Sequence, residues 1–122
     1  MTRLVNRLQR LVNTAPPAEQ ILSQFSGGTD GARVTALALA ILAPVPEHLP
    51  MALDGIQHRR SAFEQFHALS LGQGLLRLLD PPDKERLKSA VKGELGKTIT
   101  SDDPDSSRWE LAQRILKQAV LA

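Results

Sequence analysis

The residues whose spacing comes closest to known site chemistry are Glu64 and His67, which form an E-x-x-H pattern. On a helix, this spacing directs both side chains to one metal in carboxylate di-iron bundles, but those sites need a second such motif and two further glutamates. The sequence holds one motif, and His48, His58 and His67 form no H-E-x-x-H or other zinc ligand set. We therefore expect His67 to be a hydrogen-bonded helix residue, and we predict no metal and no other cofactor.

A second candidate is the run G-E-L-G-K-T at residues 93–98, which looks like the end of a phosphate-binding loop. The full signature needs a glycine five positions before Gly96, where this chain has Val91, and a buried strand before it. Residues 83–92 have the pattern of an amphipathic helix instead. The sequence therefore predicts a helix C-terminus at one of the two glycines, with Lys97 near the negative end of the helix dipole.

Nucleophilic catalysis finds no support in the sequence. There is no cysteine, and no serine lies in a G-x-S-x-G pattern. The acidic run at residues 102–105 lacks the twelve-residue calcium-loop pattern and is better explained by helix capping. We predict that the protein is not an enzyme and has no catalytic residues.

The elements that position these residues are expected to be helices. The chain has 122 residues, a net charge of +2 and 42% hydrophobic residues, with three Phe, one Trp and no Tyr. This length fits one domain over residues 1–122, and a chain rich in leucine and alanine but poor in β-branched and aromatic residues favours helices. The predicted fold is all-α, as a compact bundle of six to seven helices or a short HEAT-like antiparallel helical array.

Proline and glycine divide the chain into seven expected helices, at residues 2–13, 16–27, 30–43, 46–56, 61–79, 81–94 and from 103 or 107 to about 120. They pair naturally in sequence order, the second with the third, the fourth with the fifth and the sixth with the seventh. The third helix is expected to sit centrally, because its stripe of Val34, Leu37, Ala38, Ile41 and Leu42 leaves little polar face. Ile99 is the expected anchor of the loop that follows the sixth helix.

The fifth helix has the clearest start signal. Ser61 and Glu64 fit a capping box, in which the Ser61 hydroxyl and the Glu64 carboxylate each accept a backbone amide proton. The apolar pattern predicts that Phe63 and Phe66 are buried, so that removing either ring costs about 3–5 kcal/mol, whereas Ser61→Ala costs about 1 kcal/mol. Trp109 is the expected core residue of the last helix.

Location and membrane contact are constrained by the apolar runs. The longest, at residues 34–45, is shorter than the roughly 20 residues that a spanning helix needs. The first residues carry arginines where a signal peptide needs an apolar run. We therefore expect a cytoplasmic protein without a membrane partner.

Arginines are the candidate interaction residues, because arginine is enriched at binding hot spots. They are Arg3, Arg7, Arg10, Arg59 and Arg60. The first three lie opposite an apolar stripe, so residues 1–14 are predicted to form a basic amphipathic helix that is partly separate from the rest of the domain. The same arginines and a row at Lys84, Lys88 and Lys92 leave open the alternative of nucleic-acid binding.

Two stretches carry a family resemblance. Residues 31–39, G-A-R-V-T-A-L-A-L, resemble the repeating helix of HEAT-like proteins, and residues 60–69, R-S-A-F-E-Q-F-H-A-L, resemble small helical modules of bacterial signalling and conflict-type proteins. Such modules commonly act as adaptors, and the resemblance covers about 20 of the 122 residues. It implies a non-enzymatic adaptor or scaffold of a bacterial signalling or defence system, which docks another protein or a second copy of itself.

Overall fold

Six α-helices and one short 3-10 helix make up the part of the chain that the structure, a computed structural model, describes: residues 17–101 and 107–121. They are α2 (Ala18–Gly27), α3 (Asp30–Leu42), η1 (Pro46–His48), α4 (Leu49–Gln57), α5 (Ala62–Leu75), α6 (Pro81–Glu94) and α7 (Ser107–Leu121). The predicted all-α fold is confirmed. The helix predicted at residues 2–13 and the acidic run at 102–105 lie outside the described residues.

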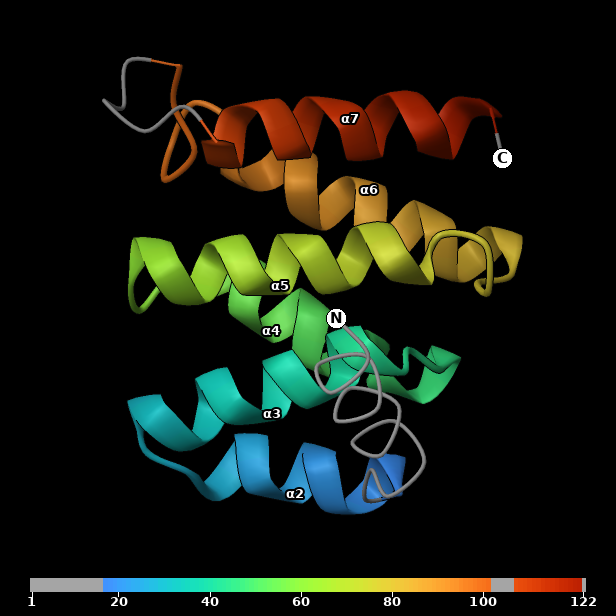
Figure 1. The fold of residues 1–122 in the computed structure, drawn as a ribbon. Coiled ribbons are helices and arrows are strands. Elements are labelled where there is room, and N and C mark those ends of the chain that lie inside the picture. Colours follow the sequence, from blue (N-terminus) through green and yellow to red (C-terminus); the bar gives the residue numbers. More distant parts are fainter. Residues whose placement is uncertain (1–16, 102–106, 122) are drawn as a thin grey trace, which may run out of the picture.

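The helices form three antiparallel hairpins stacked on one another, α2 with α3, α4 with α5, and α6 with α7, as the sequence predicted (Figure 1). In one layer α5 lies between α3 and α7 and contacts both, and behind it α4 contacts α6. The central helix is therefore α5, which also packs on α4. In none of the described helices is the apolar stretch long enough to cross a membrane.

The third helix was expected to be central, but α3 packs against α2 and α5, whereas α5 packs against α3, α4 and α7 and takes the central place. Helix α3 buries Ala36, Leu37 and Ala40, whereas Ala38 is exposed and the Leu42 side chain is 39% exposed. Because α3 carries apolar residues on most of its faces, hydrophobic periodicity alone did not fix its rotation. Ala36 and Ala40 face inward, where their small side chains allow close packing against neighbouring helices.

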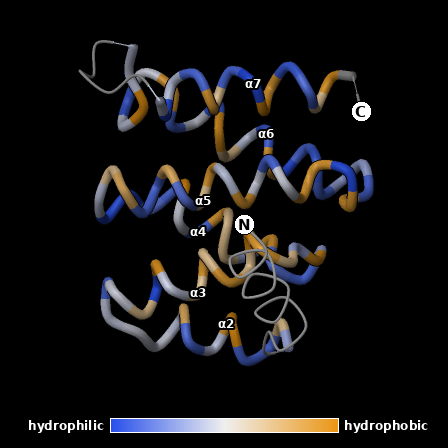
Figure 2. The backbone as a smooth tube through the Cα atoms, viewed as in Figure 1, coloured by the Kyte–Doolittle hydropathy of each residue, from blue (hydrophilic) through white to orange (hydrophobic). Residues whose placement is uncertain are grey.

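The core is built from aliphatic side chains of all six α-helices, and hydrophobic and hydrophilic residues alternate along the helices of the front layer (Figure 2). Helices α4 and α5 pack closely at Gly55, where an added Cβ would lie 2.5 Å from the Cβ of Ala68. Ile99 is fully buried, which confirms it as the loop anchor. Phe66 and Trp109 are partly buried against this core.

Helix α5 is rotated relative to the prediction. The Phe63 side chain is 61% exposed, so the prediction that it belongs to the core was wrong. The buried neighbours are Glu64 and Gln65, which are 1% and 0% exposed. Their hydrogen bonds and ion pairs to other segments hold them on the inward face of α5. A pattern that considers only apolar residues cannot predict such long-range pairing.

The start of α5 follows the capping prediction in one half only. Glu64 donates its backbone N–H to the Ser61 hydroxyl over 3.0 Å, which confirms the cap. The Glu64 carboxylate instead binds arginines of other segments, so the reciprocal half of the capping box was wrong. The helix ends at Leu75, four residues before the predicted end, and Leu79 is buried in the turn that follows.

We expect Phe63→Ala to change the free energy of unfolding by less than about 0.5 kcal/mol, because an exposed ring leaves no cavity when it is removed. Leu69→Ala is the matched control on the buried face of the same helix, where a fully buried leucine should cost about 2–5 kcal/mol. Urea denaturation of the two variants measures both values. A large loss for Phe63→Ala would show that its ring packs inside the domain.

Candidate interaction surface

A network of charged side chains joins the first two hairpins. The Glu64 carboxylate accepts a hydrogen bond from Arg33 Nε over 3.1 Å and another from Arg60 Nη1 over 2.9 Å. Arg33 also donates to the carbonyl oxygen of Gly28 over 3.1 Å and pairs with Asp30. Since Glu64 is buried and binds both arginines, this network acts as an internal clamp between α3 and α5.

Arg60, a predicted interaction residue, is held in the same network. Its Nη1 atom also donates to Asp54 over 2.9 Å, and its guanidinium lies 5.9 Å from the centre of the Phe25 ring. The hydrogen bond to Asp54, followed by that to Glu64, raises the pKa of Arg60 against the opposing effect of burial. Arg33 and Arg60 also line a groove of about 320 Å³. Because carboxylates already neutralise both arginines, this groove offers no unpaired positive charge from them to a ligand.

A second polar network fixes α7 to the body of the domain. Gln65 Nε2 donates to the carbonyl oxygen of Ile56 over 3.0 Å and to the Thr98 hydroxyl over 2.9 Å. Arg108, which is 6% exposed, donates through Nη1 to Gln65 Oε1 over 2.7 Å and to the Thr98 carbonyl over 2.8 Å. The Thr98 hydroxyl in turn donates to Glu94 over 2.7 Å. These bonds are structural, because they satisfy groups that are buried among the helices.

The structure separates the two residues of the E-x-x-H pattern. Glu64 points into its arginine clamp, whereas the Nδ1 atom of His67 lies 2.8 Å from the carbonyl oxygen of Phe63 on the outer side of α5. No group of three or more His, Asp or Glu side chains in the described ranges is placed to hold a metal ion. Gly96 has a φ of +83° in the turn after α6, as expected for a helix end and not for a phosphate-binding loop after a strand.

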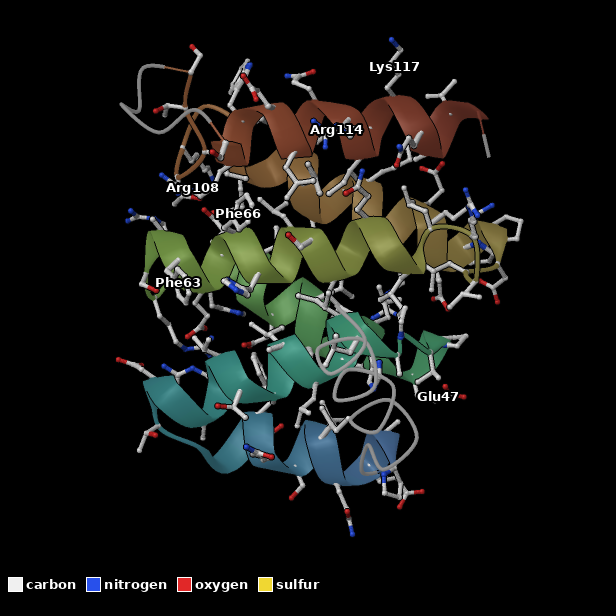
Figure 3. The ribbon with its side chains drawn as sticks, viewed as in Figure 1. Glu47, Phe63, Phe66, Arg108, Arg114 and Lys117 are labelled. Carbon is white, nitrogen blue, oxygen red and sulfur yellow. The ribbon has the colours of Figure 1, made fainter. Side chains whose placement is uncertain are left out.

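The outer side of α5 carries an aromatic cluster, which we call the Phe63 patch: Phe63, Phe66 and His67. The ring centres of Phe63 and His67 lie 4.3 Å apart, and those of Phe66 and His67 lie 6.0 Å apart. Figure 3 shows Phe63 near the start of α5 and Phe66 on the side that faces α7. The patch thus combines the exposed ring of Phe63 with the half-buried ring of Phe66 on the central helix.

Next to the patch, a groove of about 280 Å³ runs between α5 and α7. We call it the α5–α7 groove; its lining residues are Phe66, Ser70, Gln73, Ser107, Glu110, Leu111 and Arg114. Glu110 and Arg114 are exposed, and neither forms an ion pair with any residue in the described part of the chain. The groove thus has a mainly polar lining with two apolar side chains, Phe66 and Leu111, and two charges that are available to a ligand.

The predicted basic residues do not gather at this surface. Arg59 is exposed on the turn between α4 and α5, and Arg60 is in the clamp. On α6, Lys88 is paired with Glu85 over 3.1 Å. The predicted interaction residues of the first helix, Arg3, Arg7 and Arg10, lie outside the described residues.

Sequence reasoning missed Arg33, Gln65, Arg108 and Arg114. For Arg33 and Arg108 the partners lie 31 and 43 positions away, and an isolated arginine gives no signal of such a distant bond. Arg114 had a local signal, because Glu110 and Arg114 are one helical turn apart on one face.

His48 is a buried titratable group outside these networks. It is 2% exposed, its Nδ1 accepts the backbone N–H of Val45 over 3.2 Å, and its Nε2 is buried with no hydrogen-bond partner in the described residues. Burial lowers the pKa of His48 below its ordinary 6.5, and the neighbouring Glu47 opposes this effect. The geometry therefore requires a neutral ring, because a protonated Nδ1 could no longer accept the Val45 N–H.

We expect His48 to make stability depend on pH below about 6.5. The pKa of His48 is higher in the unfolded chain than in the folded one, so the unfolded chain binds the proton first as the pH falls. The free energy of unfolding is therefore highest above about pH 6.5 and decreases as the pH falls below it. One group contributes at most about 1.4 kcal/mol per pH unit. Thermal melts of the wild type and His48→Gln between neutral pH and pH 5 measure it, and the wild type should lose more. Parallel curves would contradict the assignment.

The protein is a two-layer array of three antiparallel helical hairpins, with an aromatic cluster on the outer side of the central helix. No family model, curated protein or solved structure matches the chain. The resemblance to HEAT-like helices and to bacterial adaptor modules therefore stays a prediction.

Proposed function

We propose that this chain is a non-enzymatic helical adaptor that binds another protein through the Phe63 patch. The observation that carries the proposal is the 61% exposure of Phe63 on the central helix, in a chain with three phenylalanines and one tryptophan. Hydration of an exposed ring is unfavourable, so an aromatic cluster on the surface is a site where a partner gains binding free energy by covering it.

The arrangement around the patch supports the same proposal. Glu64 and Gln65, on the opposite side of the same helix, have their polar groups bound inside the domain, so the rotation of α5 is fixed. A rigid helix that presents aromatic side chains loses little conformational entropy on binding. The exposed Arg114 next to the patch is of the residue type that most often accompanies aromatics at hot spots.

The test compares Phe63→Ser with Leu78→Ser, which removes a 45% exposed leucine outside the patch. Partners captured on the full chain are purified, and their affinity for the wild type and both variants is measured by calorimetry. We expect Phe63→Ser to weaken binding at least tenfold, or about 1.4 kcal/mol, and Leu78→Ser to leave it unchanged. Thermal melts verify that both variants are folded.

Three outcomes would contradict the proposal: no partner is found, both variants bind equally well, or the chain binds oligonucleotides in a salt-dependent way that Phe63→Ser leaves unchanged. If the captured partner is a second copy of the chain, sedimentation should show a dimer for the wild type and a monomer for Phe63→Ser. That result would support self-docking through the patch.

A further inference from the structure

We infer that the α5–α7 groove binds an extended peptide segment of the partner, in which an apolar side chain lies close to a carboxylate. This inference rests on the proposed function and adds the chemistry of the ligand. It is carried by the length of the groove, by the residues that line it and by its two charges without ion-pair partners.

The length of the groove fits a short extended segment. It follows α5 from Phe66 to Gln73 and α7 from Ser107 to Arg114. Each stretch has eight residues and so rises by about 10 Å along the helix, which is the length of about three residues of extended chain. A hydrogen bond of 3.4 Å from Gln73 to Gln118 crosses between the helices one turn beyond Arg114. The groove therefore has space for a few residues and their side chains.

The lining favours an extended backbone over a docked helix. Its apolar lining residues are Phe66 and Leu111, while Ser70, Gln73 and Glu110 supply hydroxyl, amide and carboxylate groups. The apolar face of a helix would remove these groups from water without replacing their hydrogen bonds, which is unfavourable. An extended segment presents its own backbone N–H and C=O groups, which can bond to them.

The charges determine which side chain the ligand carries. Glu110 and Arg114 stand in the i, i+4 order that commonly forms an ion pair on a helix, yet they do not pair with each other. Arg114 can therefore bind a carboxylate with its planar guanidinium, and Glu110 can accept backbone N–H groups. Because Phe66 and Leu111 line the same groove, the matching ligand has an apolar residue close in sequence to an Asp or Glu.

The test uses three short labelled peptides that contain Leu followed by Asp, Asn or Lys and are otherwise identical. They are titrated into the full chain by fluorescence anisotropy and by NMR up to millimolar concentration. We expect the Asp peptide to bind at least tenfold more tightly than the Asn peptide, and Arg114→Glu to reverse the preference in favour of the Lys peptide. Lys117→Glu is the control, because it makes the same charge change on α7 at a side chain that points away from α5 (Figure 3).

The inference is overturned if the three peptides bind alike or not at all, or if Arg114→Glu and Lys117→Glu change binding equally. It is also overturned if a single-stranded oligonucleotide displaces the Asp peptide and binds more tightly. A captured partner whose affinity depends on Phe63 but not on Arg114 would keep the proposed function and overturn this inference alone.

Discussion

Glu64→Gln lowers the free energy of unfolding by about 3 kcal/mol, a loss that we expect because the substitution removes the charge that two arginines share. The Glu64 side chain is 2% exposed, and its partners Arg33 and Arg60 are 14% and 35% exposed. After the substitution Arg33 keeps Asp30 and Arg60 keeps Asp54, but both arginines lose their buried carboxylate partner. We therefore place the expected loss at the low end of the range for a broken buried ion pair. For a domain of this size, we expect the melting temperature to fall by roughly 10 °C.

The matched control is Glu85→Gln, which makes the same chemical change in the ion pair of Glu85 with Lys88 on α6. The Glu85 side chain is 70% exposed, so solvent screening limits the expected loss to about 0.5 kcal/mol. Thermal melts of the two variants give the comparison. Equal shifts in melting temperature would show that the arginine clamp contributes no more than a surface pair.

The second large effect is expected for Gln65→Leu, which keeps the approximate shape of the side chain and removes its amide. The substitution leaves the Ile56 carbonyl and the Arg108 guanidinium each without one partner, at buried positions. An unsatisfied buried polar group costs about 1–3 kcal/mol, so we expect a total loss of about 3 kcal/mol. Because Arg108 belongs to α7, this helix should lose protection first.

Hydrogen exchange monitored by mass spectrometry separates the local effect from the global one. We expect the amides of α7 and of the turn around Thr98 to exchange faster in Gln65→Leu than those of α2 and α3. Gln73→Leu is the control, because its amide makes an exposed hydrogen bond of 3.4 Å to Gln118. A uniform increase along the chain, or an equal effect of the control, would contradict the role of Gln65.

The parts of the fold that depend on local chemistry could be predicted from the sequence. Helix α6 has the predicted bounds, 81–94, because Asp80 accepts the N–H of Asp83, proline occupies the first turn and glycine follows the helix end. The cap at Ser61 and the buried anchor Ile99 were predicted for the same kind of reason. The order of the hairpins also followed, since short connections place consecutive helices next to each other.

The rotation of α5, and with it the candidate surface, could not be predicted. The periodic apolar pattern assigns Phe63 to the core and gives no reason to bury the Glu64 carboxylate beyond its expected cap, yet Phe63 is exposed and Glu64 is buried. The decisive partner, Arg33, lies 31 positions from Glu64, and only the packed hairpins bring the two together. The two helices that differ most from expectation are α3, which buries Ala36 and Ala40, and α5, which buries Glu64 and Gln65.

The central claim is that the inward polar groups of α5 are structural and that its outer aromatic side binds the partner. An NMR titration of the full chain with its purified partner tests this claim most directly, because backbone amide shifts identify the contacted residues. We predict that the largest shifts fall on residues 63–73 of α5 and 107–114 of α7, and that α2 and α6 stay unchanged. Shifts confined to α2, to α6 or to the groove around Arg60 would contradict the account.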